Sequence, residues 1–389
     1  MPSKCALFWD ESFLWGLITY RSLKSLGLAF TLVNSEDIKS GKLTKFKALL
    51  VPGGWASNKA KALGEEGAEE IKRFVRDGGI YIGICGGAGL ATSEGLGLLA
   101  IKRRPLMERA PSVSGLVSVE VSPHPLWRGI KKPFFHIWWP SQFVVQDPSI
   151  NIIARFRSAT EETFTSDLNA FDIQNGDAGK SWDEVETEYG LNLNPARMEG
   201  DPLVLHGQYG KGGVFLSLVH FETSSSASGA RALKNLWDNF GLEKRAPENF
   251  RGLPVQAPFV SPLEELFSFG LRNFLWFERA PLIQWRRGVR GLEYFTLLEM
   301  AKELARRAGG RDRIEPLSDE VKIFCDKGRR LLLHERLALQ RGEAITFSRA
   351  SSPEMHALRT GLFGTIKSHG GEFKALLDRL DSALYKHLK

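Results

Sequence analysis

Short apolar runs alternate with longer amphipathic stretches over the first hundred residues of the chain. Between two of these runs, Leu63, Ile71 and Val75 share one helical face, and charged residues occupy the opposite face. Apolar runs of this kind are typical of strands buried on both faces of a parallel sheet. The runs are KCALFW (4–9), LAFTLV (28–33), FKALLVPGG (46–54) and GGIYIGIC (78–85). The pattern predicts a doubly wound α/β domain with a mostly parallel sheet.

The alternation weakens between residues 101 and 200 and then resumes. Strand candidates in the weaker part are GLVSVEV (115–121), SQFVVQ (141–146) and INIIARF (150–156). Residues 202–222 are predicted to form two strands joined by the turn GQYGKGG, and the helix that follows ends at Gly241. These segments extend the predicted α/β domain to residue 242.

The periodicity changes after residues 243–261, which are rich in proline and polar side chains, as is typical of a linker. Beyond this segment the apolar positions recur only at helical spacing. The candidate helices are 262–278, 281–308, 317–341, 353–366 and 371–387. We therefore expect an α/β domain over 1–242, a linker over 243–261 and an all-helical region over 262–389.

Composition narrows the class of protein. The 389 residues are 43% hydrophobic, and no apolar stretch approaches the roughly 20 residues that span a bilayer. The first residues, MPSKCALFWDESF, lack the layout of a secretory signal. The cysteines Cys5, Cys85 and Cys325 are odd in number and far apart, which argues against a disulfide framework. We expect a cytoplasmic protein.

The net charge of +7 arises in the C-terminal third, where residues 251–389 hold 24 Lys and Arg against 17 Asp and Glu. Acidic residues are interleaved there and no basic block exceeds two residues, which favours solvated helical faces over a nucleic-acid site. Aromatic residues alternate with arginines over 266–295. Three alternatives stay open for this stretch: packing within the protein, a protein partner or homo-oligomer bound through 262–389, and a membrane surface.

Cys85 stands between the apolar run IYIGI and a cluster of glycines that opens a predicted helix. A cysteine at such a turn meets the following backbone amides and the positive end of the helix dipole, which favour the thiolate. Gly83, Gly86 and Gly87 permit strained dihedral angles and the close approach of a substrate. The segment predicts a nucleophile, with a small buried cysteine as the alternative.

A nucleophilic cysteine needs a base, and the base needs an acceptor that orients it. His220 ends the apolar run LSLVH, and Glu222 lies two residues further on. Residues two apart in an extended segment point to the same side, so the Glu222 carboxylate can bind one ring nitrogen while the other faces Cys85. We expect a Cys85–His220–Glu222 triad, the alternative being a strand-end histidine with local hydrogen bonds.

An amide-cleaving site also needs donors for a developing oxyanion. The run LLVPGG ends a predicted strand with Gly53 and Gly54. A backbone amide of either glycine, together with that of Gly86, would supply two such donors.

The motifs PGG, GxCxG and HxE occur here in that order on an α/β framework. This combination resembles the class I glutamine amidotransferase-like superfamily, and within it the N-terminal domain of biotin-protein ligase. The similarity covers roughly residues 3–240 and rests on LLVPGG, IKRFVRDGGIYIGICGGAGLA and GKGGVFLSLVHFE. It implies a flavodoxin-like sheet, catalytic roles for Cys85, His220 and Glu222, and attack on an amide through a thioester. Where such glutaminases carry a glutamine-recognising segment after the cysteine, this chain has Gly87, Ala88 and Gly89.

Other residues offer weaker signals. Asp10 and Trp55 follow predicted strands and, with Gly87, are candidate substrate contacts; helix capping and packing are the alternatives. The aromatic run FFHIWWPSQ (134–142) favours a core or interface element over a pocket lining. There is no CxxC or HxxxH spacing and no phosphate loop, so we expect no metal and no cofactor.

These observations predict a cysteine-dependent amide hydrolase or amidotransferase-like enzyme acting on a small amide or peptide-like substrate. The alternative is a non-catalytic binding or scaffold protein that keeps the fold and recruits a protein or membrane partner through its basic helical region.

Overall fold

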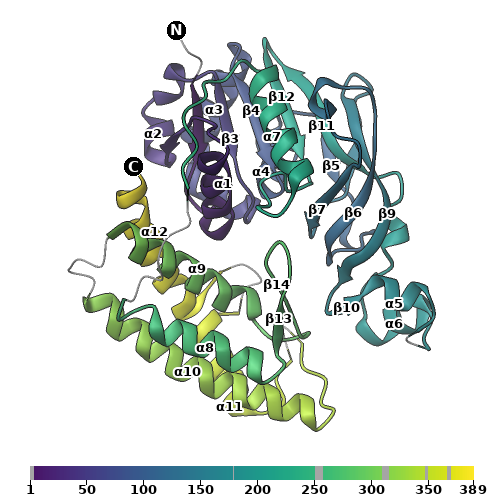
Figure 1. Cartoon of the computed structure of the whole chain (residues 1–389), viewed down its shortest axis with the longest axis vertical. Coiled ribbons are helices and arrows are strands. Elements are labelled where there is room, and N and C mark those ends of the chain that lie inside the picture. The colour runs from purple at the N-terminus through teal and green to yellow at the C-terminus, as the bar shows by residue number, and fades with distance from the viewer. Residues whose placement is uncertain (1–3, 178, 250–256, 309–314, 347–348, 366–368) are drawn as a thin grey trace. The chain divides into compact units, whose positions relative to one another are not determined.

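The computed structural model describes residues 4–177, 179–249, 257–308, 315–346, 349–365 and 369–389. The chain divides into two compact units, residues 1–250 and 251–389, each with its own core. Figure 1 shows the elements of both units.

Among the described residues, the first unit is built on a ten-stranded sheet in the order β2-β1-β3-β4-β12-β11-β9-β6-β7, with β10 paired to β9. The strands are β1 (Cys5–Phe8), β2 (Thr31–Val33), β3 (Ala48–Val51), β4 (Ile80–Ile84), β6 (Val113–Val121), β7 (Phe134–Trp138), β9 (Asn151–Thr165), β10 (Leu168–Asn169), β11 (Pro202–Tyr209) and β12 (Gly212–Ser217). The five strands from β2 to β12 are parallel, and the remaining neighbours are antiparallel. The predicted α/β fold is thus confirmed as a mixed sheet whose parallel half carries the predicted motifs.

Helices cover both faces of the parallel half. They are α1 (Phe13–Ser25), α2 (Ser35–Lys39), α3 (Ala56–Arg76), α4 (Gly86–Leu90) and α7 (Ala227–Asn239). The crossover from β1 to β2 runs in the opposite direction to that from β3 to β4, so right-handed connections put α1 and α3 on opposite faces. Figure 1 shows α1 and α7 in front of the sheet. The order reverses between β1 and β3, the place where open α/β sheets bind ligands at the carboxyl ends of their strands.

The core of this unit follows from the apolar runs. Every residue of β1 and β3 is buried, and α3 turns Leu63, Ile71 and Val75 inward at helical spacing. Each such side chain, when fully buried, contributes roughly 1.5–3 kcal/mol. The helix α3 begins at Ala56, seven residues before Leu63, the first position of the predicted helical face. It has non-helical angles at Gly64, so most of the predicted face lies beyond that kink.

Between residues 101 and 200, the strands predicted over 115–121, 141–146 and 150–156 are confirmed as β6, β8 (Phe143–Val145) and the first part of β9. Other elements in this range were not predicted. The aromatic run forms β7, and β5 (Ile101–Arg103) pairs with β8 (Phe143–Val145) in a separate two-stranded sheet. Two helices in this range were also not predicted, α5 (Ala170–Gln174) and α6 (Trp182–Tyr189). The second begins at a capping box in which Ser181 and Glu184 bind each other's backbone amides, a local signal present in the sequence.

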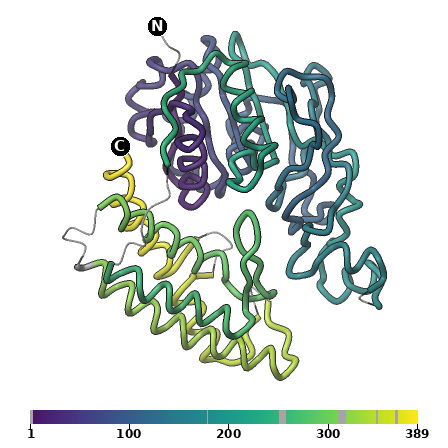
Figure 2. The backbone as a smooth tube through the Cα atoms, viewed as in Figure 1, coloured from purple at the N-terminus to yellow at the C-terminus, as the bar shows by residue number. Residues whose placement is uncertain are grey.

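The first part of the predicted linker is fastened to the α/β unit. The amides of Ala29 and Arg245 donate to the carbonyls of Glu243 and Gly27, and the Glu248 amide donates to the Lys24 carbonyl. Figure 2 shows this segment running beside α1. These hydrogen bonds attach residues 243–248 to the α/β unit. The linker over 243–261 stays a prediction, and residues 250–256 lie outside the described residues.

The second unit contains α8 (Ser261–Arg272), α9 (Gly291–Ala308), α10 (Glu315–Gln340), α11 (Pro353–Phe363) and α12 (Gly371–Leu388). The helical prediction needs one correction, because β13 (Trp276–Glu278) and β14 (Ile283–Trp285) form an antiparallel hairpin between α8 and α9. The helix α8 stops at Arg272, and Phe274 has a positive φ of 55°, which a helix cannot accommodate. Strands of three residues are too short to show an alternating pattern.

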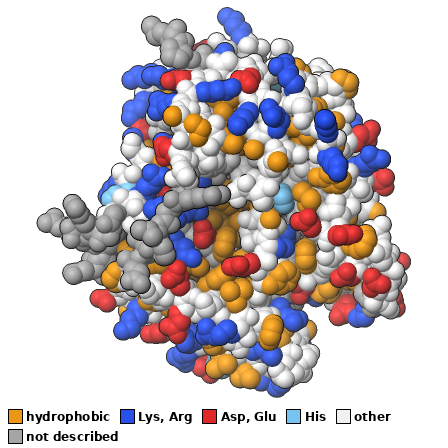
Figure 3. All heavy atoms as spheres, in the orientation of Figure 1, with side chains coloured by type: hydrophobic (Ala, Val, Ile, Leu, Met, Phe, Trp, Pro, Cys, Tyr) orange, Lys and Arg blue, Asp and Glu red, His pale blue; other side chains and the backbone are white. Residues whose placement is uncertain are grey.

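The core of the second unit is an aromatic cluster, in which the Tyr294 and Phe363 rings meet edge to face with centroids 5.6 Å apart. In the part of the chain that the structure describes, no helix is both long and apolar enough to cross a membrane. Basic and acidic side chains intermingle over the visible surface of this unit (Figure 3).

Candidate active site

Cys85 occupies the turn between β4 and α4 at the carboxyl edge of the parallel strands. Its backbone adopts φ 50° and ψ −106°, an uncommon conformation for a residue with a side chain. The Cys85 amide donates a 2.7 Å hydrogen bond to the Ser217 carbonyl at the end of β12. The side chain is partly exposed. The turn therefore holds the sulfur at the sheet edge where the glycine pattern predicted it.

The glycine turn after β3 lies against this turn. A Cβ on Gly86 would stand 1.7 Å from the Gly54 carbonyl oxygen, so the two backbones can approach only because residue 86 has no side chain. Gly54 itself has a positive φ of 106°. Among the described residues, the amides of Gly54 and Gly86 donate to no protein acceptor. Two backbone donors next to Cys85 are therefore available to a ligand.

His220 and Glu222 follow β12 and are almost completely buried, with 1% and 0% of their surface exposed. The His220 Nδ1 and Glu222 Oε1 atoms lie 2.7 Å apart. The His220 amide donates to the His136 carbonyl of β7, which fixes the backbone beside the ring. The predicted pairing of these two residues is thus present as a short, buried hydrogen bond.

The surroundings of His220 favour its protonated form. Burial by itself lowers the pKa of the imidazole, but the Glu222 carboxylate and the Cys85 sulfur beside the ring together raise that pKa above its ordinary value. With Nδ1 donating to Glu222, the second nitrogen, Nε2, is buried and has no hydrogen-bond partner among the described residues. The Cys85 Sγ instead contacts the Trp138 carbonyl oxygen at 3.6 Å.

Aromatic side chains that the sequence did not assign to the site surround this histidine. The Trp15 indole of α1 stacks on the His220 ring with centroids 4.4 Å apart, and it also meets Trp138 at 5.9 Å. Trp139 stacks on Trp138 and is 40% exposed. The aromatic run 134–142 was the available signal, whereas nothing in the sequence near Trp15 connects it to His220.

The remaining predicted site residues have structural contacts. The Asp10 carboxylate accepts from the Ser35 amide at 2.8 Å, so it caps the start of α2. Gly53 is buried against Trp15, and the Gly87 carbonyl accepts from the Tyr81 hydroxyl at 2.7 Å. Trp55 precedes α3 and is 38% exposed. A direct substrate contact stays a prediction for Asp10, Trp55 and Gly87.

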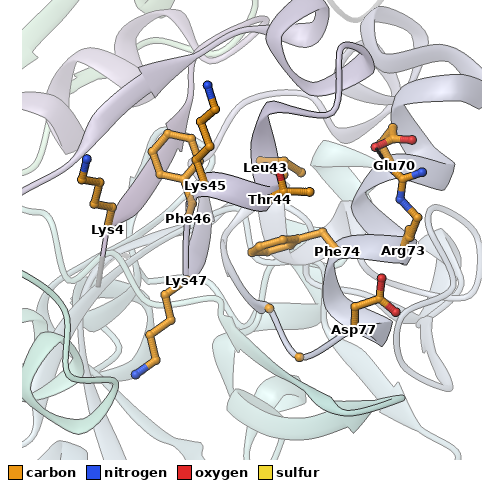
Figure 4. A pocket seen from close by; sticks show the side chains of 12 residues that line it. Lys4, Leu43, Thr44, Lys45, Phe46, Lys47, Glu70, Arg73, Phe74 and Asp77 are labelled. Atoms are coloured by element: carbon orange, nitrogen blue, oxygen red, sulfur yellow. Dashed lines mark hydrogen bonds and ion pairs between the residues drawn. The ribbon is translucent and has the colours of Figure 1, made fainter. Parts of the chain in front are cut away.

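A pocket of about 510 Å³ lies at the opposite, amino-terminal edge of β1, β3 and β4. In Figure 4 the Lys47 ammonium group points away from those of Lys4 and Lys45, so the three groups do not converge on one centre. Because these residues precede the strands, this pocket is remote from Cys85. In the described ranges, no group of three His, Cys, Asp or Glu side chains is placed to hold a metal ion.

Comparison with known proteins supports the resemblance. Residues 17–95 match the family described as "Biotin-protein ligase, N terminal", a range that includes Cys85 and ends before His220. No curated protein matches the chain.

Three similar solved structures are distant. PurLQS from Thermotoga maritima is 16% identical, with 61% of this chain and 99% of that chain covered and a TM-score of 0.43. A GMP synthase subunit from Thermoplasma acidophilum is 12% identical, with 62% of this chain and 94% of that chain covered and a TM-score of 0.38. A β-galactosidase from Bacillus circulans is 13% identical, with 62% of this chain and 32% of that chain covered and a TM-score of 0.36. Similarity at this level does not identify a reaction.

Proposed function

We propose that the first unit is a cysteine-dependent amide hydrolase or amidotransferase-like enzyme that uses Cys85, His220 and Glu222. One observation carries the proposal: a fully buried His220–Glu222 hydrogen bond stands beside a partly exposed cysteine on a strained turn. Burying a charged pair costs desolvation energy, so a protein that keeps one at a sheet edge favours a functional role for it. Residues with strained backbone angles also cluster at functional sites. The family match over residues 17–95 supports the same interpretation.

In the proposed first half-reaction, the Cys85 thiolate attacks the carbonyl carbon of the substrate amide. The amides of Gly54 and Gly86 stabilise the oxyanion that forms. The C–N bond then breaks, the His220 imidazolium gives its Nε2 proton to the departing amine, and a thioester remains on Cys85. Glu222 keeps Nδ1 protonated and the ring in place throughout.

In the second half-reaction, His220 accepts a proton from water, and the resulting hydroxide attacks the thioester carbonyl. The C–S bond breaks, the carboxylic acid leaves and the thiolate returns. An amine acceptor in place of water would give transfer instead of hydrolysis. Apart from Cys85, whose sulfur lies beside the ring, no described side chain competes for Nε2.

The direct test measures amide turnover of the purified full-length protein and of Cys85→Ala. We expect Cys85→Ala to abolish turnover while the circular dichroism spectrum and the melting temperature stay unchanged, because alanine keeps the Cβ that the turn already accommodates. Amide turnover by Cys85→Ala at the native rate would rule out Cys85 as the nucleophile.

The alternative function is binding without catalysis. It is favoured by the exposure of Phe274 and Phe277 on the second unit, at 72% and 49%. In that case Cys85→Ala would preserve the cellular function, and removing residues 257–389 would abolish it.

A further inference from the structure

Lys59 of α3 is a charged residue that the proposed mechanism does not use. Its side chain is completely buried, with 0% of its surface exposed. Lysine is almost never buried to this extent unless its ammonium group has partners, because removing that charge from water is costly. The contacts of the Lys59 ammonium group therefore indicate what it does.

The Lys59 ammonium group binds the loop that joins β1 to α1. Its Nζ atom donates to the Ser12 hydroxyl and, at 3.4 Å, to the Asp10 carbonyl. The side-chain amide of Asn58, one residue earlier in α3, donates to the Glu11 carboxylate at 3.2 Å. Two consecutive residues of α3 thus bind all three residues of this loop.

The loop needs such support because its backbone is strained. Glu11 and Phe13 have positive φ values of 55° and 44°, although neither is a glycine. Residues with side chains persist in this region only where the surrounding structure holds them there. Ser12 lies between them, is buried, and donates its hydroxyl to the Phe8 carbonyl at 3.2 Å. The Lys59 ammonium group therefore binds the loop between its two strained positions.

The same loop borders the turn that carries Gly54. A Cβ on Gly54 would stand 2.6 Å from the Glu11 carbonyl oxygen and 3.6 Å from the Lys59 Nζ atom, so both groups lie against this glycine. Gly54 also touches Gly86, the residue that follows Cys85. The Gly54 amide, a proposed oxyanion donor, thus lies in a turn that contacts both the cysteine turn and the loop that Lys59 binds.

We propose that Lys59 is a positioning residue for the oxyanion donor at Gly54. By binding the loop between β1 and α1, its ammonium group holds the Glu11 carbonyl against the glycine turn and so fixes the orientation of the Gly54 amide. Oxyanion donors act through their fixed position, because they then need no reorganisation while the charge develops. The inference rests on the proposed function, and Lys59 touches no substrate atom in this role.

The test compares two reactions of Cys85 in the full-length protein. Acylation by p-nitrophenyl acetate passes through an oxyanion: the thiolate attacks the ester carbonyl, the C–O bond breaks, p-nitrophenolate leaves and an acetyl thioester remains. Alkylation by iodoacetamide displaces iodide and forms no oxyanion. In Lys59→Met, we expect the burst of p-nitrophenolate to slow about tenfold or more, while the rate of Cys85 alkylation stays unchanged.

The matched control is Lys61→Met, which removes an exposed charge from the same helix and should change neither rate. Melting temperatures identify a variant that fails to fold. If Lys59→Met is such a variant, Ser12→Ala takes its place, because it removes the hydroxyl that Nζ binds and keeps the lysine. We expect Ser12→Ala to slow acylation and to leave alkylation unchanged.

A second measurement does not depend on acylation. Isotope labelling of glycine carbon and nitrogen restricts an NMR spectrum to Gly–Gly pairs, which include 53–54 and 212–213. The residual dipolar coupling of an N–H bond reports its orientation. In Lys59→Met, the coupling should change at Gly54 and stay the same at Gly213 in β12.

Each other outcome overturns the proposal. Equal slowing of acylation and alkylation would show that Lys59 only maintains the fold of the site, and an unchanged burst would remove Lys59 from the reaction. An unchanged N–H orientation at Gly54 would refute the positioning role whatever the two rates. If the native protein and Cys85→Ala release p-nitrophenolate alike, the proposed function fails, and the coupling at Gly54 still decides whether Lys59 positions that amide.

Discussion

The backbone of Gly86 touches the backbone of Gly54, so closely that a Cβ on Gly86 would lie 1.7 Å from the Gly54 carbonyl oxygen. Through this contact, the turn after β3 and the turn after β4 share one edge of the sheet. The two proposed oxyanion donors, the amides of Gly54 and Gly86, can therefore lie this close only because residue 86 is a glycine.

Gly86→Ala should destabilise the first unit by roughly 2–4 kcal/mol, because backbone rather than a movable side chain opposes the new methyl group. Urea unfolding measures this loss. The matched control is Gly361→Ala in α11, where the added Cβ meets nothing within 4 Å and should have little effect or stabilise the helix. Equal stability of Gly86→Ala and the native protein would contradict the close approach.

The three thiols should react very differently with iodoacetamide near neutral pH. Burial raises the pKa of Cys5 to about 12 and that of Cys325 to about 12, and both side chains are buried. Cys85 is partly exposed beside His220, so mass spectrometry after a brief reaction should find the label at Cys85 alone. A Cys85 that reacts no faster than free glutathione would argue against an activated thiolate.

Glu222→Gln should lower the pKa of His220, because it removes the carboxylate that raises it. The imidazole would then lose its proton at a lower pH than in the native protein, a shift that NMR titration of the ring can follow. If the proposed mechanism operates, kcat should also fall about a hundredfold, since the ring loses its orienting acceptor. Glu120→Gln, which removes an exposed carboxylate from β6, serves as the control and should change neither quantity.

The second unit buries an ion pair in which Arg359 Nη2 lies 2.9 Å from Glu335 Oε1, with 6% and 0% of the side chains exposed. Burial raises the pKa of Glu335 to about 7, and the Arg359 charge opposes that rise. Because this folded-state pKa exceeds the ordinary value, the contribution of Glu335 to stability is fully present below about pH 4.5 and is lost as the pH rises through 7.

Arg359→Met should therefore destabilise the second unit in a pH-dependent way. At pH 8 the variant leaves a buried carboxylate without its partner, which costs about 3–5 kcal/mol. At pH 5 the loss should be smaller, because Glu335 can take up a proton. Urea unfolding at both pH values measures the difference, and adding Glu335→Gln should restore much of the stability at pH 8. An equal loss at the two pH values would show that the charge of Glu335 is not responsible.

The local patterns of the sequence determined much of the α/β unit. Apolar runs marked β1, β3, β4 and β12, and the glycines around Cys85 marked the turn, because strand burial and turn geometry depend on residues within one short segment. The spacing of His220 and Glu222 predicted their hydrogen bond for the same reason. Where the local signal was short, as for the hairpin β13–β14, the all-helical prediction was wrong.

Only the tertiary structure decided which distant segments meet at Cys85. The stacking of Trp15 on His220, the Trp138 carbonyl beside the sulfur and the guanidinium of Arg103 against Gly89 each join elements far apart in the chain. Such contacts follow from the order in which the strands pair, and the hydrophobic period of a segment carries no information about its neighbours in the sheet. The sequence determined the candidate nucleophile and its base, while the fold decided what surrounds them.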